Sequence, residues 1–188
     1  MPEVEYSTTM GLAPEAIWEF VKDMNNWAPF LTGYQKHTIE SETDSVWTLK
    51  GDVGILSRQI ELRAHVTEWN GPQRVAFTLT GLNEAVDGGG TLTISKSTGV
   101  SPREKREGLF RRVLQAIFRF LFRCMHGTGP KRLAPTGNTV SQLTFTLRMD
   151  AGGPTGPLVN AMLAPALLPA AEDLANKIAA HLEKSQAA

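Results

Sequence analysis

Alternation of apolar and polar residues over most of the chain predicts a fold rich in β-strands. The first alternating run covers residues 4–10. Later runs are separated by breaks rich in glycine, proline and asparagine, which are typical of turns. These runs predict strands near 34–40, 45–50, 56–69, 74–81 and 91–96, and a last strand over about 139–149.

The longest run indicates that the sheet has one apolar face and one polar face. The apolar residues that share a face are Leu56, Ile60, Leu62, Ala64 and Val66. The polar residues that share the other face are Ser57, Gln59, Glu61, Arg63, His65 and Thr67. This pattern is typical of an antiparallel sheet that is covered on one side only. His65 is therefore expected at the surface.

A helix is predicted between the first two strands. Pro14 is suited to a first helical turn, and an apolar stripe begins at Ile17. The helix is expected to end near Asp23, and a short irregular or helical piece follows over 27–31.

A second, long helix is predicted over roughly 156–184, after the last strand. Its first half is apolar and its second half is amphipathic. Pro165 and Pro169 lie inside it, and each removes an intrahelical hydrogen bond, so a kink or break is expected. The fold class is then α+β: one domain over 1–188, with a curved antiparallel sheet around a long C-terminal helix.

The inward side chains of the sheet and the helix predict either a cavity for a hydrophobic molecule or a solid core. Largely apolar voids are typical small-molecule sites. The sequence leaves both interpretations open for each residue. The candidate cavity residues are Trp27, Phe30, Leu31, Tyr34, Trp47, Leu49, Leu62, Phe77, Leu79, Leu92, Ile94, Leu143, Phe145, Leu158, Met162 and Leu163.

Residues 98–137, here called the insertion, interrupt the last two strands. The part over 103–125 predicts a helix about 34 Å long at 1.5 Å per residue. A narrow polar stripe crosses an otherwise apolar surface, so the helix must be buried against a partner. Arginines occur too often for a transmembrane span.

Three partners for this helix remain open: the mouth of the domain's own cavity, a second protein, or a membrane surface. Arginine together with phenylalanine is typical of helices that lie in the membrane interface. The residues expected to contact a membrane or a partner are Phe110, Arg111, Arg112, Phe118, Arg119, Leu121, Phe122 and Arg123.

Charge is distributed unevenly, although the formal net charge is zero. Residues 96–132 hold ten Lys or Arg and two Glu, a net charge of +8, and the remainder carries −8. The asymmetry favours an anionic partner for the basic segment.

Cys124 is the single cysteine, which excludes an internal disulfide, and the acidic start at Glu3 and Glu5 is unlike a secretory leader. We expect a cytoplasmic protein in peripheral contact with the inner face of the membrane.

Motifs for common chemistry are missing from the sequence. No phosphate-binding G-x-x-x-x-G-K-[ST] loop occurs, and Gly88-Gly89-Gly90 is expected to form a bulge or turn. The histidines lack metal-ligand spacing, so neither a metal nor a cofactor is expected. The aromatics of the basic segment form a continuous apolar band, which argues against nucleic-acid binding.

Several motifs resemble the START-like (SRPBCC) helix-grip superfamily. They are Leu12–Asp23, which includes Ala13-Pro14-Glu15-Ala16-Ile17-Trp18, and Trp27–Tyr34. Two further segments, Lys50–Ser57 and Ala151–Gly156, resemble the CoxG-like branch of that superfamily, whose members are associated with carbon monoxide dehydrogenase.

That resemblance implies a non-enzymatic carrier. The cargo would be an isoprenoid quinone or similar lipid, bound non-covalently, and the partner a molybdenum-type carbon monoxide dehydrogenase or related oxidoreductase. Two alternatives remain: a cavity enzyme of the polyketide cyclase or hydrolase type, and a non-catalytic interaction module. An enzyme needs a convergent polar pair inside the cavity, and only Tyr34 and Trp47 offer polar groups at expected inward positions.

Overall fold

The computed structural model describes residues 2–53, 56–97, 140–154 and 156–186. The insertion, 98–137, lies wholly outside the described residues. The predictions for its helix over 103–125 therefore stay predictions.

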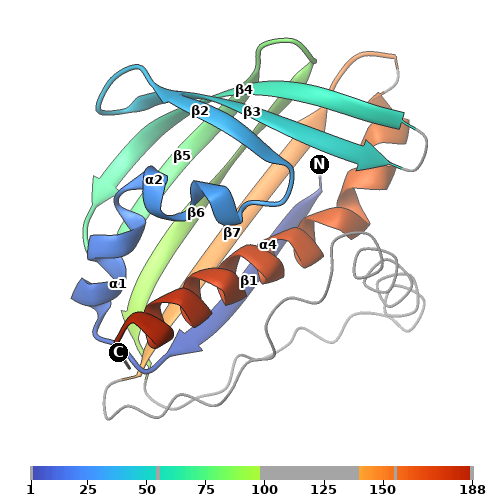
Figure 1. Cartoon of the computed structure of the whole chain (residues 1–188). Coiled ribbons are helices and arrows are strands. Elements are labelled where there is room, and N and C mark those ends of the chain that lie inside the picture. Colours follow the sequence, from blue (N-terminus) through green and yellow to red (C-terminus); the bar gives the residue numbers. More distant parts are fainter. Residues whose placement is uncertain (1, 54–55, 98–139, 155, 187–188) are drawn as a thin grey trace.

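A seven-stranded antiparallel sheet forms the body of the molecule, and it curls around a long helix (Figure 1). The strand order across the sheet is β1-β7-β6-β5-β4-β3-β2. The strands are β1 (Glu3–Met10), β2 (Tyr34–Ile39), β3 (Asp44–Val53), β4 (Leu56–Asn70), β5 (Arg74–Gly81), β6 (Val86–Lys96) and β7 (Ser141–Ala151). The predicted α+β fold class, a curved antiparallel sheet around a C-terminal helix, is confirmed.

Three short helical segments follow β1. They are α1 (Pro14–Val21), α2 (Met24–Trp27) and the 3₁₀ helix η1 (Ala28–Phe30). Pro14 occupies the first turn of α1, where its missing N–H costs no hydrogen bond. The side chain of Asp23 caps α2 by accepting a hydrogen bond from the backbone N–H of Asn25 at 2.9 Å.

The long helix α4 (Gly156–Gln186) runs through Pro165 and Pro169 without interruption. Its axis changes direction part-way along, as expected for a helix with internal prolines (Figure 1). Asn160 fixes the start of α4 to the end of β7: its Oδ1 accepts from the backbone N–H of Ala151 at 2.7 Å, and its Nδ2 donates to Asp150 at 2.9 Å.

The glycine run Gly88–Gly90 is neither a bulge nor a turn, as the sequence had suggested, but part of β6. It pairs on both sides, with Leu79, Thr78 and Phe77 of β5 and with β7. A Cβ on Gly89 would lie 2.6 Å from the carbonyl oxygen of Phe77. Glycine is required here because neighbouring backbone and the Phe77 ring occupy the space of a side chain.

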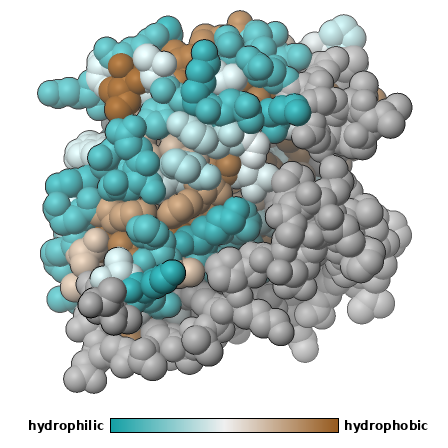
Figure 2. All heavy atoms as spheres, viewed as in Figure 1, coloured by the Kyte–Doolittle hydropathy of each residue, from teal (hydrophilic) through white to brown (hydrophobic). Residues whose placement is uncertain are grey.

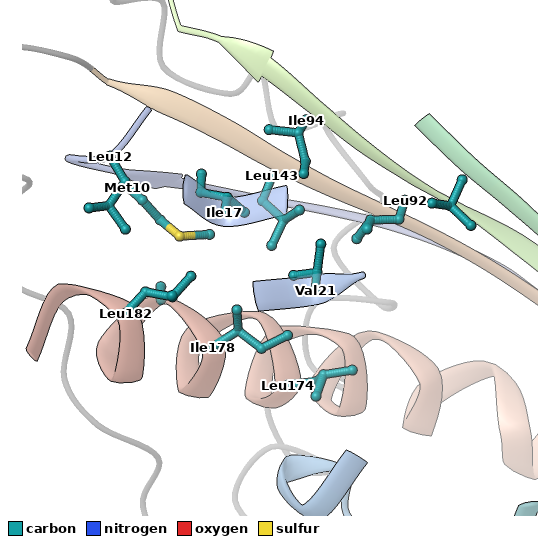
Figure 3. Close-up of a cluster of buried hydrophobic side chains, with 12 residues drawn as sticks. Met10, Leu12, Ile17, Val21, Leu92, Ile94, Leu143, Leu174, Ile178 and Leu182 are labelled. Atoms are coloured by element: carbon teal, nitrogen blue, oxygen red, sulfur yellow. The ribbon is translucent and has the colours of Figure 1, made fainter. Parts of the chain in front are cut away.

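The main hydrophobic core lies where the C-terminal half of α4 meets the sheet (Figure 3). Met10, Leu143 and Ile178 are each 0% exposed and come from β1, β7 and α4. Ile17 of α1 is equally buried and closes the same cluster. The two-sided pattern of the strands thus places their apolar side chains under α4, as predicted.

Replacing Gly90 with alanine tests the close packing of β6. The added Cβ would overlap the carbonyl oxygen of Thr146 and lie 2.9 Å from Cζ of Phe77. We expect Gly90→Ala to lower the free energy of unfolding by about 1–3 kcal/mol in urea denaturation. Gly51→Ala is the matched control, because nothing lies within 4 Å of its added Cβ. Equal stability of both variants would contradict the packing argument.

Candidate functional site

The inward face of the sheet has a buried cluster at each end and a less covered zone between them. The larger cluster includes Leu92, Ile94 and Leu143. The smaller one consists of Leu62, Val86 and Ala151. Between them lie three inward residues that are only partly buried and belong to neither cluster in the described contacts: Phe77, Leu79 and Leu147.

The zone between the clusters, here called the middle zone, is short of side-chain volume. Strand β6 presents Gly88 and Gly90 to the inward face there, because they pair with Leu79 and Phe77. Strand β4 contributes Ala64, which pairs with Leu79. Two glycines and an alanine therefore give this face little side-chain volume of its own, and the ring of Phe77 lies close to Gly90.

The position of α4 adds to this shortage of cover. Among the described residues, the backbone of α4 lies closest to β1, β7 and η1, and the side chain of Val159 reaches the small cluster that includes Leu62 of β4. Strands β3, β4 and β5 belong to the part of the sheet that curls over the helix from the side away from β1 and β7 (Figure 1). In the space-filling view, apolar atoms form a band across the middle of the described part, between hydrophilic margins (Figure 2).

The structure divides the predicted cavity residues into groups. Five are buried and pack within the protein: Trp47, Leu62, Leu92, Ile94 and Leu143. Nine remain partly exposed: Trp27, Phe30, Leu31, Tyr34, Leu49, Phe77, Leu79, Phe145 and Leu163. Leu158 is 66% exposed, so the prediction that it lines an internal cavity is wrong. It lies in the first turn of α4. The side chain of Met162 lies outside the described part.

An aromatic cluster covers the inward face of β2 and β3. The rings of Trp27 and Trp47 stack with centroids 5.5 Å apart, and the ring of His37 stacks on Trp47 at 4.8 Å. Tyr34 completes the group in a T-shaped arrangement with Trp47, with ring centroids 6.2 Å apart. Tyr34, His37 and Trp47 belong to β2 and β3, whereas Trp27 of α2 also packs against the main core.

Two hydrogen bonds involve the polar groups of Tyr34, His37 and Trp47 in this cluster. The hydroxyl of Tyr34 lies 2.8 Å from Nδ1 of His37. The indole Nε1–H of Trp47 donates to Oγ of Ser45 at 2.9 Å, and Ser45 is only 2% exposed. The Trp47 bond satisfies a buried donor, whereas Tyr34 and His37 are both partly exposed.

Helix α4 and the helical segments before β2 hold the cluster in place. The indole Nε1–H of Trp27 donates to the carbonyl oxygen of Val21 at 2.9 Å, which orients the ring. Asp173 of α4 accepts from the hydroxyl of Thr32 at 3.0 Å and pairs with Lys177 at 2.6 Å. Lys177 also donates to the carbonyl oxygen of Phe30 at 3.3 Å. Part-buried polar contacts therefore connect α4 with the segment that leads from Trp27 to Tyr34.

Sequence reasoning missed His37 and Ser45 as parts of this site. Tyr34 and His37 are three positions apart, which in a regular strand places side chains on opposite faces. A register shift between Tyr34 and Lys36 brings both onto the inward face, opposite Leu49 and Trp47. The sequence carries no clear signal of that shift.

Two surface hollows lie outside the space between the inward face of the sheet and α4. One, of about 320 Å³, lies between the start of α1 and the β4–β5 turn, and its lining includes Pro14, Pro72 and Lys96. The other, of about 310 Å³, lies on the outer face of the sheet between Arg74 and Arg148. Neither coincides with the predicted cavity, which stays a prediction.

Neither a metal cluster nor a membrane-spanning helix is found in the described part of the chain. No group of three or more His, Cys, Asp or Glu side chains in it could hold a metal ion. No helix in it is long and apolar enough to cross a membrane. The residues predicted for membrane or partner contact, from Phe110 to Arg123, lie outside the described residues.

His65 is separate from the site. It lies on the outer face of β4, half exposed as predicted, and its Nδ1 is 2.9 Å from Asp44. Hydrogen bonds from His65, and then from Thr43 and Ser41, hold the pKa of the Asp44 carboxyl below its usual value. His65 thus hydrogen-bonds the first residue of β3, next to a surface turn, whereas His37 lies on the inward face.

Comparison with known proteins supports the fold. The profile of one protein family matches residues 1–122, more than half of the chain. A START superfamily protein from Mycobacterium smegmatis is similar, with a TM-score of 0.55, 13% identity and 97% of each chain covered. A conserved protein from Geobacillus kaustophilus gives 0.58 and 16% identity, covering 97% of this chain and 96% of that one.

A Thermus thermophilus protein is similar to the same extent. It gives a TM-score of 0.57 at 12% identity, covering 98% of this chain and 99% of that one. No curated protein matches the sequence. At these identities the solved structures show that the fold is shared over nearly the full length. The match to the family profile is a similarity in sequence, over residues 1–122.

Removing the Ser45 hydroxyl tests the polar support of the cluster. Ser45→Ala leaves the buried indole N–H of Trp47 without its acceptor, and an unpaired buried donor costs about 1–3 kcal/mol. We expect that loss in the free energy of unfolding, with a change in the Trp47 contribution to near-ultraviolet circular dichroism. Ser95→Ala, at an exposed position of β6, is the control. Wild-type stability of Ser45→Ala would show that the bond does not support the cluster.

Proposed function

The chain belongs to the START-like (SRPBCC) superfamily. On that premise we propose that it is a carrier, which binds a hydrophobic small molecule in a site that lies between the sheet and α4. The observation that carries this proposal is the middle zone, where β6 presents Gly88 and Gly90 to the inward face and Phe77 and Leu79 stay partly exposed. Apolar side chains that a domain of this size leaves uncovered on an inward face are typical of a ligand site.

The ligand that we propose is an isoprenoid quinone or similar lipid. The middle zone offers apolar contact for a chain, and the aromatic cluster on β2 and β3 offers flat surfaces for a ring. No covalent attachment is needed, because burying apolar surface contributes about 25 cal/mol per Å². The resemblance of Lys50–Ser57 and Ala151–Gly156 to the CoxG-like branch supports this class of cargo.

Delivery would link the membrane with a redox enzyme. The basic segment over 96–132 favours contact with anionic lipid, and the resemblance favours a partner of the molybdenum-type carbon monoxide dehydrogenase class. A carrier of this kind performs no chemistry on its cargo, so no catalytic residue is proposed.

A second candidate is an enzyme that acts on an apolar substrate. The observation in its favour is the convergent polar pair of Tyr34 and His37 on the inward face, 2.8 Å apart. A hydroxyl and an imidazole within hydrogen-bond reach can move a proton. Turnover of a bound species in mass spectrometry would favour the enzyme, and a lipid that purifies unchanged with the protein would favour the carrier.

Filling the middle zone tests ligand binding. Leu79 pairs with Ala64 and Gly88, so a tryptophan at this position would have only small cross-strand neighbours, and the proposal requires the zone to accommodate it. We expect Leu79→Trp to change the free energy of unfolding by less than about 1 kcal/mol. The affinity for a decyl-substituted benzoquinone, measured by displacement of an apolar fluorophore, should fall about tenfold or more, a change of ~1.4 kcal/mol.

Leu143→Trp is the matched control for this experiment. Leu143 is 0% exposed in the main core, so the same enlargement there should cost about 1–3 kcal/mol or more through overpacking. If Leu79→Trp is destabilised as strongly as Leu143→Trp, the zone is solid and the carrier proposal is wrong.

Membrane docking is tested separately by liposome flotation. Burying one phenylalanine contributes about 1.5–3 kcal/mol, and an arginine near an anionic surface about 1 kcal/mol. We therefore expect the double variant Phe118→Glu and Phe122→Glu to lose most of its binding to vesicles that contain anionic lipid. Lys36→Glu, on the edge strand β2, is the control. Flotation of the double variant at the wild-type level would reject docking through this segment.

A further inference from the structure

We propose that Tyr34 and His37 form the polar end of the ligand site and recognise a planar ring that carries a carbonyl oxygen. This inference rests on the proposed carrier function and assigns the orientation of the ligand. The ring of the ligand would lie against the aromatic cluster, and its apolar chain would run into the middle zone.

The hydrogen bonds available to His37 support this assignment. Nδ1 lies 2.8 Å from the Tyr34 hydroxyl, and within the described part of the chain no hydrogen bond involves Nε2. When the hydroxyl donates to Nδ1, the neutral imidazole carries its proton on Nε2. Nε2–H is then a donor without an acceptor among the residues that the structure describes, on a side chain that is partly exposed. A carbonyl oxygen is the matching acceptor.

The aromatic neighbours restrict the shape of the group that fits. The His37 ring is stacked on Trp47 with an interplanar angle of 18°, and Trp27 is stacked on Trp47 at 24°. These near-parallel planes hold the imidazole edge in one orientation. A flat ring can stack among such side chains while its oxygen reaches the imidazole edge, whereas a bulky or fully saturated headgroup gains no stacking.

The register of the sheet connects this polar end with the middle zone. His37 lies opposite Trp47, which lies opposite Leu62, and the adjacent row runs from Ser45 through Ala64 to Leu79. From β2 to β5 there are three strand spacings, about 14 Å in total. The distance suits a ring followed by a short apolar chain.

Two probes with the same apolar chain separate headgroup recognition from general lipid binding. The probes are a decyl-substituted benzoquinone and decylbenzene, and both affinities are measured by displacement of one apolar fluorophore. We expect the wild type to prefer the quinone by about tenfold, the value of one net hydrogen bond with stacking. His37→Phe keeps an aromatic ring without the donor, and it should lose most of that preference while binding decylbenzene as before.

Tyr34→Phe provides a second variant that retains the ring. Without the hydroxyl that donates to Nδ1, the imidazole tautomer is no longer fixed, so the quinone preference should fall about threefold or more. His65→Gln, a histidine change on the outer face, should leave the preference at the wild-type level. Nitrogen NMR of His37 should show the Nε2–H tautomer in the quinone complex.

The outcomes distinguish the two proposals. If the wild type binds both probes and His37→Phe keeps the preference for the quinone, headgroup recognition by this pair is wrong and the carrier function stands. If the wild type binds neither probe, the carrier function is wrong and the present inference falls with it. A preference that disappears in His37→Phe and persists in His65→Gln supports both.

Discussion

The apolar inward face of a seven-stranded sheet must be covered, and one helix provides most of the cover. Helix α4 packs along β1 and β7, where Leu143 and Ile178 are completely buried. A helix with side chains is about 10 Å wide, which is roughly the width of two strands. It therefore cannot cover β3, β4 and β5 as well, and the sheet has to curl over it. The rest of the structure follows from this mismatch of widths.

The closed core and the middle zone lie at different places on the inward face of the sheet. At one end of the inward face Met10, Ile17 and Leu143 form a closed core with α4, and burial of such side chains contributes about 1.5–3 kcal/mol each. Once that core secures the fold, the middle zone can remain incompletely filled at a modest cost. Gly88 and Gly90 contribute no inward side chain to that zone, although the Phe77 ring packs close to Gly90.

Most of the fold could be predicted from the sequence because strands and helices have different periods. The alternation around Leu62 and the apolar stripe at Ile17 each fix one face of an element, and the structure confirms both faces. The same reasoning failed for Gly88–Gly90, since glycine usually marks a turn. Here the cause is tertiary: the Phe77 ring and neighbouring strand backbone lie where side chains would be, and a single sequence does not reveal such a contact.

The candidate site was predictable only for its apolar members. Trp27, Tyr34 and Trp47 were identified because large aromatic side chains at inward positions need cover, whereas His37 depends on the irregular register of β2. A shift of one residue moves every following side chain to the other face. In a regular strand, the imidazole would point to solvent on the outer face. The shift places it instead beside Tyr34 and over Trp47, so that one local irregularity gives a largely apolar surface a convergent pair of polar groups.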